Sequence, residues 1–572
     1  MIGRQSSPSR RTRRRPPVPG EIEIARVRLM VAGSLAIAGF LLVATRLTIV
    51  TVLPTTEATR TIHPTKPSTY NVSRANILDR NGKLLATNLK TFSLYANPNL
   101  IQNPKSTAEK IVAILPDLAI ETVERQLEEK RSFVWIKRGL TPEQKYELNK
   151  LGNPALDFKT EEKRFYPAGR VAGHVVGFTN IDNQGRGGFE RKFDRELTTT
   201  SASFSLSIDL RVQYIISQAL RDALKNFKAI GATGIVMDAN NGQVIAMVSL
   251  PDFNPNHLSS TTDKTRFNQA THGVYEMGST FKIFTTAMAL ESRKISIQDG
   301  YDASRPIRVG RFVIRDYRAK NRWLSLPEIL IHSSNIGSAK MALDVGRDKQ
   351  RDFLKRLGLL EKPTLELEEE EIGSPITPNP WRDVNAMTIG YGHGIAVSPI
   401  QITSAVAAVI NGGIFYQPTL LLNRSNLGGR RVVSEKTSDK IRRLLRVVVT
   451  NGSGRKADAA NYLVGGKTGT AEKVEGQGYK RKAVRSSFVG AFPMNKPRYV
   501  VFAMIDEPIG NKDTLGYATG GWVAAPLVGR VISRIAPLLG VKPVNHENPR
   551  VQNQMAISIV TKKLGKKHFA SF

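Results

Sequence analysis

A long stretch without charge near the N-terminus restricts the fold of this chain more than any other feature of its sequence. From Leu29 to Thr45 the sequence LMVAGSLAIAGFLLVAT carries no charged side chain, and after Arg46 the apolar run continues to Leu53. A bilayer core needs about 20 apolar residues in a helix, and an arginine near one end can extend its guanidinium to the interface. The sequence therefore predicts one transmembrane helix over 29–53.

The charges in front of this run predict how it crosses the membrane. Residues 1–28 form a basic tail in which Glu21 and Glu23 are outnumbered by arginines: Arg4, Arg10, Arg11, Arg13, Arg14, Arg15, Arg26 and Arg28. By the positive-inside rule this tail is cytoplasmic. We expect a single-pass protein of the inner (plasma) membrane whose larger part is extracytoplasmic, that is, periplasmic. A cleaved signal sequence or a buried core helix is the alternative, although the run is longer than the apolar part of a signal peptide.

Composition excludes several classes of function. The 83 Lys and Arg against 49 Asp and Glu give a net charge of +34, which suits either nucleic acid or an anionic membrane surface. Because no nucleic-acid motif accompanies the charge, we expect no nucleic-acid partner. The chain has no cysteine, so disulfides, thiol nucleophiles and cysteine-bound zinc are excluded. Its eight histidines form no cluster with metal-ligand spacing, and we expect no metal and no cofactor.

The first extracytoplasmic region is predicted to span 54–203, opening on a linker rich in proline and threonine. An Asp-Arg-Asn-Gly turn between the apolar pairs Ile77-Leu78 and Leu84-Leu85 predicts a hairpin. Residues 106–152 look helical, with capping residues at the starts of two segments. This mixed region shows no catalytic cluster.

A second region is predicted over 204–543. Its strand patterns, ATGIVMDANNGQVIAMVSL near the start and VRSSFVGAF and RYVVFAMID near the end, enclose a mainly helical middle. Strands at both ends imply one sheet assembled from distant segments, which is an α+β fold. Residues 544–572 are polar and lysine-rich, and we expect this tail to be disordered.

Two S-x-x-K motifs occur in the chain. Ser279 and Lys282 lie in YEMGSTFKIF before a helix-forming run, whereas Ser453 and Lys456 lie in NGSGRKAD, where glycines favour a loop. Residues three apart on a helix share a face, and a serine at a helix start lies at the positive end of the dipole. A lysine becomes a base when its pKa falls by roughly 3 units from about 10.4, through desolvation or a second cation. Ser279 is therefore a candidate nucleophile with Lys282 as its base.

Two later segments could complete such a site. HSSNIGSAK supplies a hydroxyl and an amide, Ser333 and Asn335, at an expected helix start. VGGKTGTAEK supplies Lys467, Thr468, Gly469 and Thr470 on an expected strand. Strand alternation would place Thr468 and Thr470 on one face, and Gly469 would let a substrate backbone approach closely.

The ordered set S-x-x-K, S-x-N and K-T-G resembles that of the serine penicillin-recognising enzymes, the β-lactamases and penicillin-binding proteins. SRANILDRNGKLLA, RFYPAGRVAGHVVGF and GRGGFE resemble the pedestal domain of class B penicillin-binding proteins, and GYGHGIAVSPIQI, SFVGAFP and VAAP resemble their transpeptidase domain. The chain departs from the family at Ala75, where glycine is usual, and at Met277, where proline is frequent. Both departures concern local backbone geometry.

The resemblance implies a membrane-anchored α+β protein. A mixed pedestal domain of the dimerisation type would precede a β-lactamase-like transpeptidase domain, in which helices flank an antiparallel sheet. Its substrate would be the D-alanyl-D-alanine end of peptidoglycan stem peptides, and β-lactams would stop the reaction at the acyl-enzyme. An amine from a neighbouring strand would otherwise attack the acyl-enzyme and form a cross-link.

The resemblance also assigns roles to the motif residues. Ser279 would attack the peptide carbonyl while Lys282 takes its proton, and Ser333 would relay a proton to the leaving amine. Asn335 would hold Lys282 and the substrate amide. Lys467 would keep Lys282 deprotonated and would bind the substrate carboxylate together with Thr468 and Thr470. The N–H groups of Ser279 and Thr470 would form the oxyanion hole.

Other enzyme classes fit less well. A Walker A loop ending at Gly466-Lys467-Thr468 fails because Asn461 stands where its first glycine belongs. No G-x-S-x-G elbow occurs, and no E-x-x-L-N motif follows the S-x-N motif to supply the deacylation base of a β-lactamase. A D,D-carboxypeptidase, which passes the acyl group to water, stays open, as does a non-catalytic β-lactam sensor or scaffold.

Within class B, the compact pedestal and the short tail are more similar to the division-specific transpeptidase than to the elongation-specific one. The resemblance then implies a position at the division site. Its partners there would be a polytopic glycosyltransferase and other division proteins.

Overall fold

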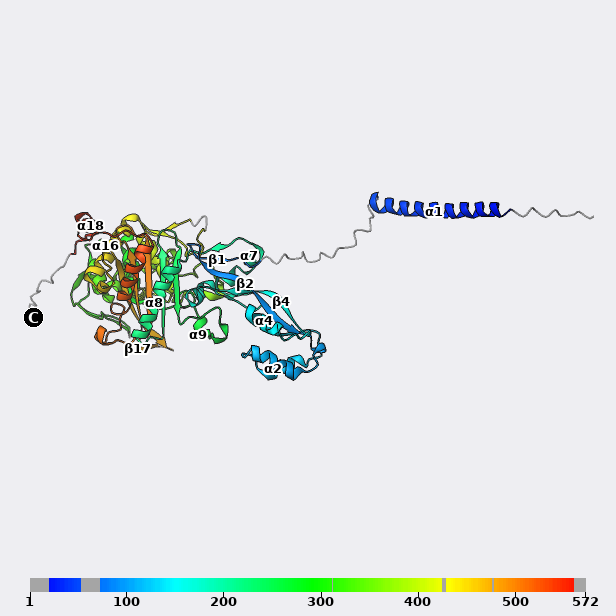
Figure 1. Ribbon diagram of the computed structural model, residues 1–572. Helices are drawn as coiled ribbons and strands as arrows, with labels where there is room; N and C mark the ends of the chain where they lie inside the picture. Colours follow the sequence, from blue (N-terminus) through cyan, green and yellow to red (C-terminus); the bar gives the residue numbers. More distant parts are fainter. Residues whose placement is uncertain (1–19, 53–72, 311, 424–427, 476–477, 560–572) are drawn as a thin grey trace, which may run out of the picture. The chain divides into compact units, whose positions relative to one another are not determined.

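The computed structural model describes residues 20–52, 73–310, 312–423, 428–475 and 478–559 (Figure 1). The chain forms two units, Met1–Asn71 and Val72–Phe572. The predicted linker 54–68 and most of the predicted basic tail 1–28 lie outside the described residues.

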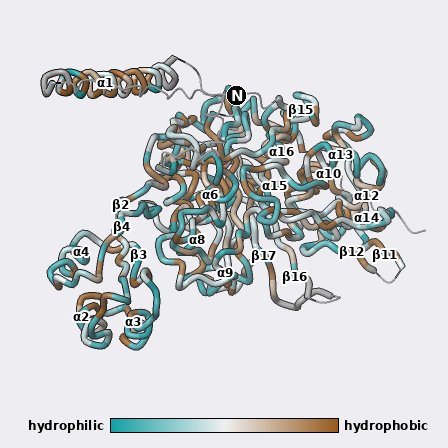
Figure 2. The backbone as a smooth tube through the Cα atoms, turned by 90° about the vertical axis from the view of Figure 1, so that its right-hand side faces the viewer, coloured by the Kyte–Doolittle hydropathy of each residue, from teal (hydrophilic) through white to brown (hydrophobic). Residues whose placement is uncertain are grey.

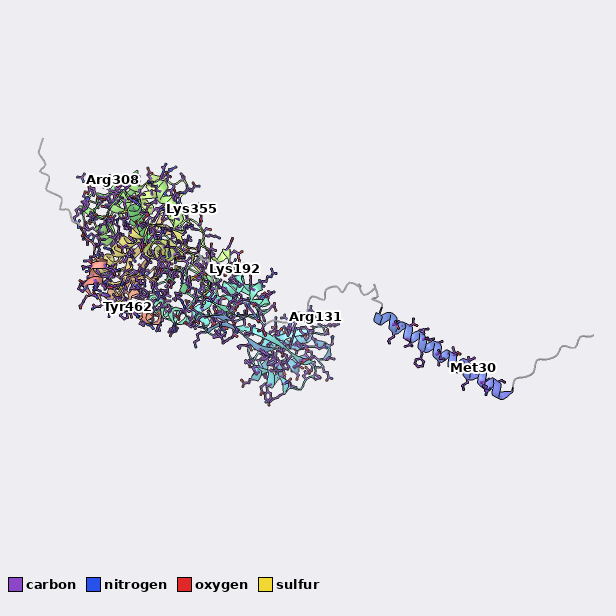
Figure 3. The ribbon with its side chains drawn as sticks, turned by 90° about the horizontal axis from the view of Figure 1, so that it is seen from above. Met30, Arg131, Lys192, Arg308, Lys355 and Tyr462 are labelled. Atoms are coloured by element: carbon purple, nitrogen blue, oxygen red, sulfur yellow. The ribbon has the colours of Figure 1, made fainter. Side chains whose placement is uncertain are left out.

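The first unit contains helix α1, Glu21–Val52. Its segment Arg26–Thr48 is long and apolar enough to cross a membrane, and none of that segment is buried by the rest of the chain. Hydrophobic residues occur along most of its length (Figure 2), and Met30, labelled in Figure 3, is 65% exposed. A helix that is apolar on all sides needs an apolar surrounding. Among the described residues it is the one helix of this kind, consistent with a single-pass anchor.

The second unit opens with the predicted hairpin, which the structure confirms. Strands β1, Ile77–Leu78, and β2, Leu84–Ala96, pair antiparallel. The carboxylate of Asp79 accepts hydrogen bonds of 2.8 Å from the N–H groups of Asn81 and Lys83 and so closes the turn. Gly82 has φ +77°, a conformation that favours glycine.

The prediction of helix throughout 106–152 is wrong in its middle. The helices are α2, Pro104–Ile114, α3, Ile120–Leu127, and α4, Pro142–Asn149, but β3, Val134–Leu140, is a strand paired with β2. The pairing buries Ile136 and Leu140 against these helices. A strand fixed by a partner 40 residues away in sequence leaves little local signal. Of the two expected caps, Thr141 caps α4, whereas α2 begins earlier than expected and is capped by Asn103 instead of Ser106.

A buried ion cluster ties together the start, the long strand and the end of this region. Glu190 accepts hydrogen bonds from the Nε atoms of Arg74 and Arg164, both at 2.6 Å, and all three side chains are at most 1% exposed. Arg164 also donates to the carbonyl of Ala75 at 2.9 Å, the position of one family departure. The remaining elements are β4, Leu156–Phe165, α5, Gly173–Val176, β5, Phe178–Thr179, β6, Gly185–Gly187, α6, Gly188–Lys192, α7, Asp194–Thr199, and β7, Phe204–Ser205.

Replacing Glu190 with glutamine should lower the free energy of unfolding by about 3–5 kcal/mol, because Arg164 would then be buried without a counter-charge and Arg74 would keep only its pair with Asp194. Thermal unfolding of the full-length protein in detergent measures the effect. The matched control is Glu147→Gln, which breaks an exposed pair with Lys150 and should cost less than about 1 kcal/mol. Equal, small effects of both substitutions would contradict the prediction.

The second region is built on a five-stranded antiparallel sheet in the order β16-β17-β18-β8-β9. Its strands are β8, Gly231–Asp238, β9, Val244–Leu250, β16, Gly465–Glu475, β17, Gly478–Phe492, and β18, Tyr499–Asp506. Strands more than 200 residues apart in sequence are neighbours, since β8 pairs with β18. The prediction of an α+β domain with a sheet assembled from distant segments is confirmed.

Helices cover both faces of this sheet. Helices α8, Leu210–Asn226, and α17, Ala524–Leu538, share one apolar core with it, and α15, Pro399–Ile410, is buried in a second core on the opposite side. The other elements are α9, Asp263–Arg266, α10, Lys282–Glu291, β10, Gly300–Asp302, β11, Ile307–Val309, β12, Phe312–Ile314, β13, Trp323–Ser325, α11, Leu326–His332, α12, Asn335–Val345, α13, Arg347–Arg356, α14, Asp383–Ile389, β14, Ile414–Phe415, β15, Arg430–Arg431, and α16, Glu435–Asn451.

The C-terminal stretch departs from the expectation of disorder over 544–572. It contains helix α18, Pro549–Met555, capped by Asn548, and Met555 is buried in the larger core. Ile557 packs against the same core, and the N–H of Val544 donates to the carbonyl of Asn461 at 2.7 Å, so several contacts hold this stretch against the domain. Residues 560–572 lie outside the described part of the chain.

Candidate active site

Ser279 lies in the first turn of a helical segment. A 3-10 turn, Gly278–Phe281, leads directly into α10, which begins at Lys282. Gly278 has φ +53°, and a Cβ there would lie 2.7 Å from the carbonyl oxygen of Thr470. Glycine therefore lets the nucleophile's turn rest against strand β16. Met277, the other family departure, precedes it with φ −95° and ψ −1°.

The amine of Lys282 is completely buried and lies among four oxygen atoms. Its two shortest contacts, both 2.7 Å, are to the carbonyl oxygen of Ser333 and to Oδ1 of Asn335. These oxygens only accept, so they use the two hydrogens of a neutral amine. The lone pair is then left for the hydroxyl of Ser279, whose Oγ is 2.9 Å away.

Burial and charge both favour the neutral form of this lysine. Desolvation lowers the pKa of Lys282 well below 10.5, the nearby ammonium of Lys467 lowers it further, and Asp316 opposes them. Burial alone lowers the pKa of Lys467 to about 7. Desolvation and a second cation, the two effects expected to lower the pKa of Lys282, are therefore both present.

The S-x-N segment reaches the site through an unusual backbone conformation. Ser333 follows α11 with φ 57° and ψ 46°, and Ser334 caps α12. The Ser333 hydroxyl lies 2.9 Å from Oγ of Ser279 and 3.1 Å from the amine of Lys282. Asn335 donates from Nδ2 to the carbonyl of Arg315 at 2.9 Å, which turns its Oδ1 toward Lys282.

Asp316 holds this segment and was missed by the sequence reasoning. Its carboxylate accepts from the hydroxyl of Ser334 at 2.7 Å and from the N–H groups of Asn335 and Ile336 at 2.6 and 3.0 Å. An acid 18 residues before Ser334, the N-cap of the helix, leaves no local pattern. Only the packing of the two segments reveals it.

The K-T-G segment lies on β16, the edge strand of the five-stranded sheet. Lys467 is buried and donates to the hydroxyl of Ser333 at 3.0 Å. Gly469 packs closely against the next strand, since a Cβ there would lie 2.3 Å from Oγ of Ser487. Thr470 accepts a hydrogen bond of 3.1 Å from the N–H of Gly520. Because an edge strand pairs on one side only, alternate N–H groups of β16 face away from the sheet.

The other S-x-x-K motif begins in a turn at Ser453, as its glycines predicted, and Lys456 lies in a short 3-10 helix, Arg455–Ala457, yet the motif adjoins the same site. Ser453 lies in the turn after α16, and its Oγ is 2.8 Å from Oγ1 of Thr468. The ammonium of Lys456 lies 4.4 Å from the centre of the Trp522 ring. Sequence spacing alone gave no reason to place this turn beside the K-T-G strand.

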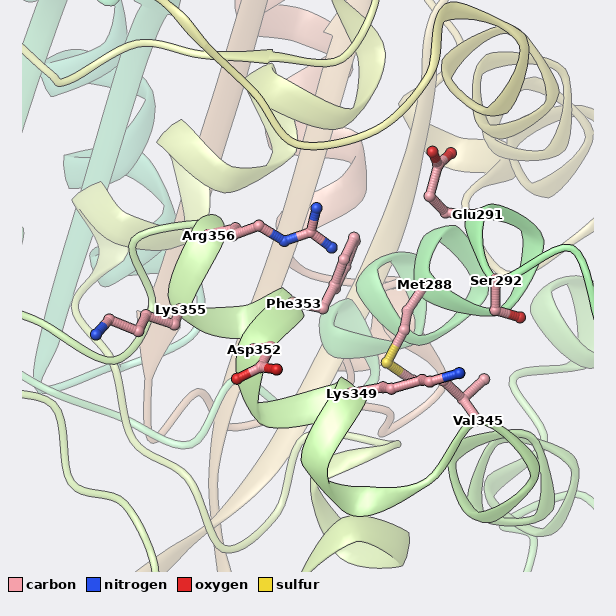
Figure 4. A pocket seen from close by; sticks show the side chains of 9 residues that line it. All are labelled: Met288, Glu291, Ser292, Val345, Lys349, Asp352, Phe353, Lys355 and Arg356. Carbon is pink, nitrogen blue, oxygen red and sulfur yellow. The ribbon is translucent and has the colours of Figure 1, made fainter.

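A separate hollow of about 500 Å³ lies where the ends of α10 and α12 face α13 (Figure 4). Met288, Val345 and Phe353 line it, together with charged side chains of α13. None of the motif residues lines this hollow. The site is therefore defined by the hydrogen bonds among the three motifs.

Comparison with known families and structures agrees with this geometry. Residues 232–533 match the penicillin binding protein transpeptidase domain, and residues 69–209 match the penicillin-binding protein dimerisation domain. A crystal structure of penicillin binding protein 3 from Mycobacterium tuberculosis in complex with aztreonam aligns with a TM-score of 0.66 and 22% identity, covering 83% of this chain and 97% of that one. That likeness shows the fold.

Of three similar sequences, two carry the name of a peptidoglycan D,D-transpeptidase. The probable peptidoglycan D,D-transpeptidase FtsI of Caulobacter vibrioides is 38% identical over 486 residues, 82% of each chain. The peptidoglycan D,D-transpeptidase FtsI of Escherichia coli K12 is 27% identical and matches 83% of this chain and 85% of its own. Stage V sporulation protein D of Bacillus subtilis is 31% identical, with 83% and 79% covered. With three convergent motifs and both domain matches, this chain belongs to the class B penicillin-binding proteins, which join a dimerisation domain to a transpeptidase domain.

Proposed function

We propose that the chain cross-links peptidoglycan stem peptides at the division septum through an acyl-enzyme on Ser279. It is a serine-type peptidoglycan D,D-transpeptidase of the FtsI kind and binds penicillins. The observation that carries the mechanism is the completely buried Lys282, whose amine lies 2.9 Å from the Ser279 hydroxyl and whose pKa is lowered by burial and by Lys467. The proposed domains are a pedestal over 54–203 and a transpeptidase domain over 204–543.

Acylation follows from the hydrogen bonds of the free site. Lys282 takes the proton of Ser279 as its oxygen attacks the carbonyl carbon of the penultimate D-alanine. The C–N bond then breaks, and the amine of the terminal D-alanine needs a proton to leave. The Ser333 hydroxyl, 2.9 Å from Ser279 and 3.1 Å from Lys282, is placed to pass the proton from the lysine to that amine.

The remaining groups would bind the donor peptide. Lys467, with Thr468 and Thr470, would hold the terminal carboxylate, and Asn335 would hold the substrate amide. The N–H groups of Ser279 and Thr470 would stabilise the oxyanion of the tetrahedral intermediate. The close contact of Gly278 with Thr470 supports this pairing, because it brings the two backbones together.

The second half-reaction returns Ser279 to its free form. An acceptor amine from a neighbouring strand attacks the ester carbonyl, its proton passes to Lys282, and the serine oxygen leaves with a proton. A new amide bond then joins the two peptides. A β-lactam acylates the same serine, but its amine stays tethered to the acyl group and blocks the acceptor.

The septal assignment is supported by the names of similar sequences and by the compact pedestal. The helix α1 would anchor the chain in the inner membrane with the basic tail in the cytoplasm and the catalytic domain outside it. A polytopic glycosyltransferase would supply nascent strands, and other division proteins would gather at the same place.

Cross-linking can be tested with the full-length protein in liposomes and peptidoglycan strands freshly polymerised from a lipid-linked precursor. We expect cross-linked muropeptide dimers and released D-alanine, and benzylpenicillin should abolish both. Release of D-alanine with monomers alone would identify a carboxypeptidase instead. Labelling by penicillin without any product would identify a sensor.

The cellular role needs a separate measurement. Depletion of the protein should give filamentous cells, and a fluorescent fusion should gather at the division site. Round cells would contradict the septal assignment and favour the elongation-specific role.

A further inference from the structure

The turn that carries the second S-x-x-K motif has no part in the mechanism above, although it borders the substrate side of β16. Ser453 is exposed, and its hydroxyl is within hydrogen-bonding distance of Thr468, at 2.8 Å. Thr468 is one of the residues that would hold the donor carboxylate. The question is what this contact does to the threonine hydroxyl.

The hydrogen-bonding capacity of Thr468 decides the direction of the contact. A hydroxyl carries one hydrogen and accepts two hydrogen bonds. The amine of Lys467 lies 3.4 Å from Oγ1 of Thr468 and, while protonated, can only donate to it. A bound carboxylate only accepts. Thr468 can therefore bond to the carboxylate only if Ser453 donates to Thr468 and leaves its single hydrogen free.

The backbone of the turn is held firmly enough to keep this geometry. The N–H of Gly454 donates to the carbonyl of Val448 at the end of α16, at 3.2 Å. On the other side, a Cβ on Gly521 would lie 2.7 Å from the carbonyl oxygen of Ser453, so the turn and the loop before α17 are in close contact. Ser453 is thus fixed from both sides while its hydroxyl faces Thr468.

A row of aromatic and cationic side chains connects this turn to the segment around Asp316. Trp522, beneath the ammonium of Lys456, stacks on Tyr517 with 5.7 Å between ring centres, and the guanidinium of Arg318 lies 5.6 Å from the Tyr517 ring. Arg318 is two residues from Asp316, which holds the S-x-N segment. The turn therefore contacts the K-T-G segment directly and reaches the S-x-N segment through these side chains. The positive charges of Lys456 and Arg318 favour an anionic ligand.

We propose that Ser453 is a positioning residue for the donor carboxylate. Its hydroxyl donates to Oγ1 of Thr468 and directs the Thr468 hydrogen toward that carboxylate. This inference rests on the proposed function, because it deepens the role given there to Thr468. The two consecutive hydrogen bonds, from Ser453 to Thr468 and from Thr468 to the carboxylate, strengthen one another.

The test compares two ligands that differ in the carboxylate alone. Acylation of the full-length protein is followed by intact mass with benzylpenicillin and with its methyl ester. Ser453→Ala should reduce the acylation efficiency of the acid roughly three- to tenfold, the value of one hydrogen bond, mainly through weaker binding rather than a slower limiting rate. The ester should change less than about twofold, and Ser453→Thr should restore the acid.

The control variant is Ser260→Ala, at a site that takes no part in the proposed chemistry. Ser260→Ala removes an exposed hydroxyl that bonds the backbone of His257 and should leave both ligands unaffected. An equal loss for acid and ester would show that Ser453 only supports the fold, and an unchanged rate for the acid would also overturn the inference. A wild-type protein that forms no adduct with either ligand would instead overturn the proposed function.

Discussion

Replacing Ser279 with alanine should leave the full-length protein without the covalent adduct that benzylpenicillin forms on the wild type. The substitution removes the oxygen that lies 2.9 Å from both the Lys282 amine and the Ser333 hydroxyl. The Ser333 hydroxyl also contacts Lys282, at 3.1 Å, and we expect it to relay protons rather than to be acylated. Intact-mass spectrometry after incubation with the antibiotic measures the loss, which should be complete within detection.

The other S-x-x-K serine provides the matched control. Ser453→Ala should still form the adduct at saturating antibiotic at close to the wild-type rate, because the substitution mainly weakens binding. Thermal unfolding of the Ser279→Ala protein should match the wild type, because alanine fits wherever serine does. An undiminished adduct on Ser279→Ala would mean that the antibiotic acylates another residue, and the assignment of the site would fail.

Replacing Lys282 with methionine should slow acylation by roughly 10²- to 10⁴-fold, the range for a positioned general base. Methionine keeps an unbranched side chain of similar length in a fully buried place, so packing is largely retained. Stopped-flow acylation with a chromogenic cephalosporin measures the rate. A variant that retains a tenth of the wild-type rate or more would show that another group takes the serine proton.

The pH dependence follows from the same lysine. Below its pKa Lys282 is protonated and has no lone pair, so the wild-type rate should be low and should rise as pH increases through that pKa. Burial and the charge of Lys467 place this rise well below pH 10.5. Lys467, with its pKa lowered to about 7, loses its charge as pH rises through that value, so affinity for a carboxylate ligand should fall there. The Lys282→Met protein should lack the rise, and a rise that persists would contradict the assignment.

The sequence by itself determined the elements whose causes are local. The apolar run that became α1 and the hairpin around Asp79–Gly82 depend on neighbours within a few residues. The spacing of Ser279 and Lys282 also belongs here, because one helical turn joins them. The order of the three motifs indicated the family, because that order can be read directly from the sequence.

Only the tertiary structure decided which distant groups meet. Strand β3 exists because β2 pairs with it, Asp316 caps a helix across a loop, and α18 is ordered by the burial of Met555. Ser453 was set aside on its local sequence and yet contacts Thr468. Local sequence patterns fix the backbone conformation through contacts between residues that are close in the chain. The contacts of β3, Asp316, Met555 and Ser453 instead join residues far apart in the chain. They depend on how whole helices and strands pack, and a local sequence pattern does not show this.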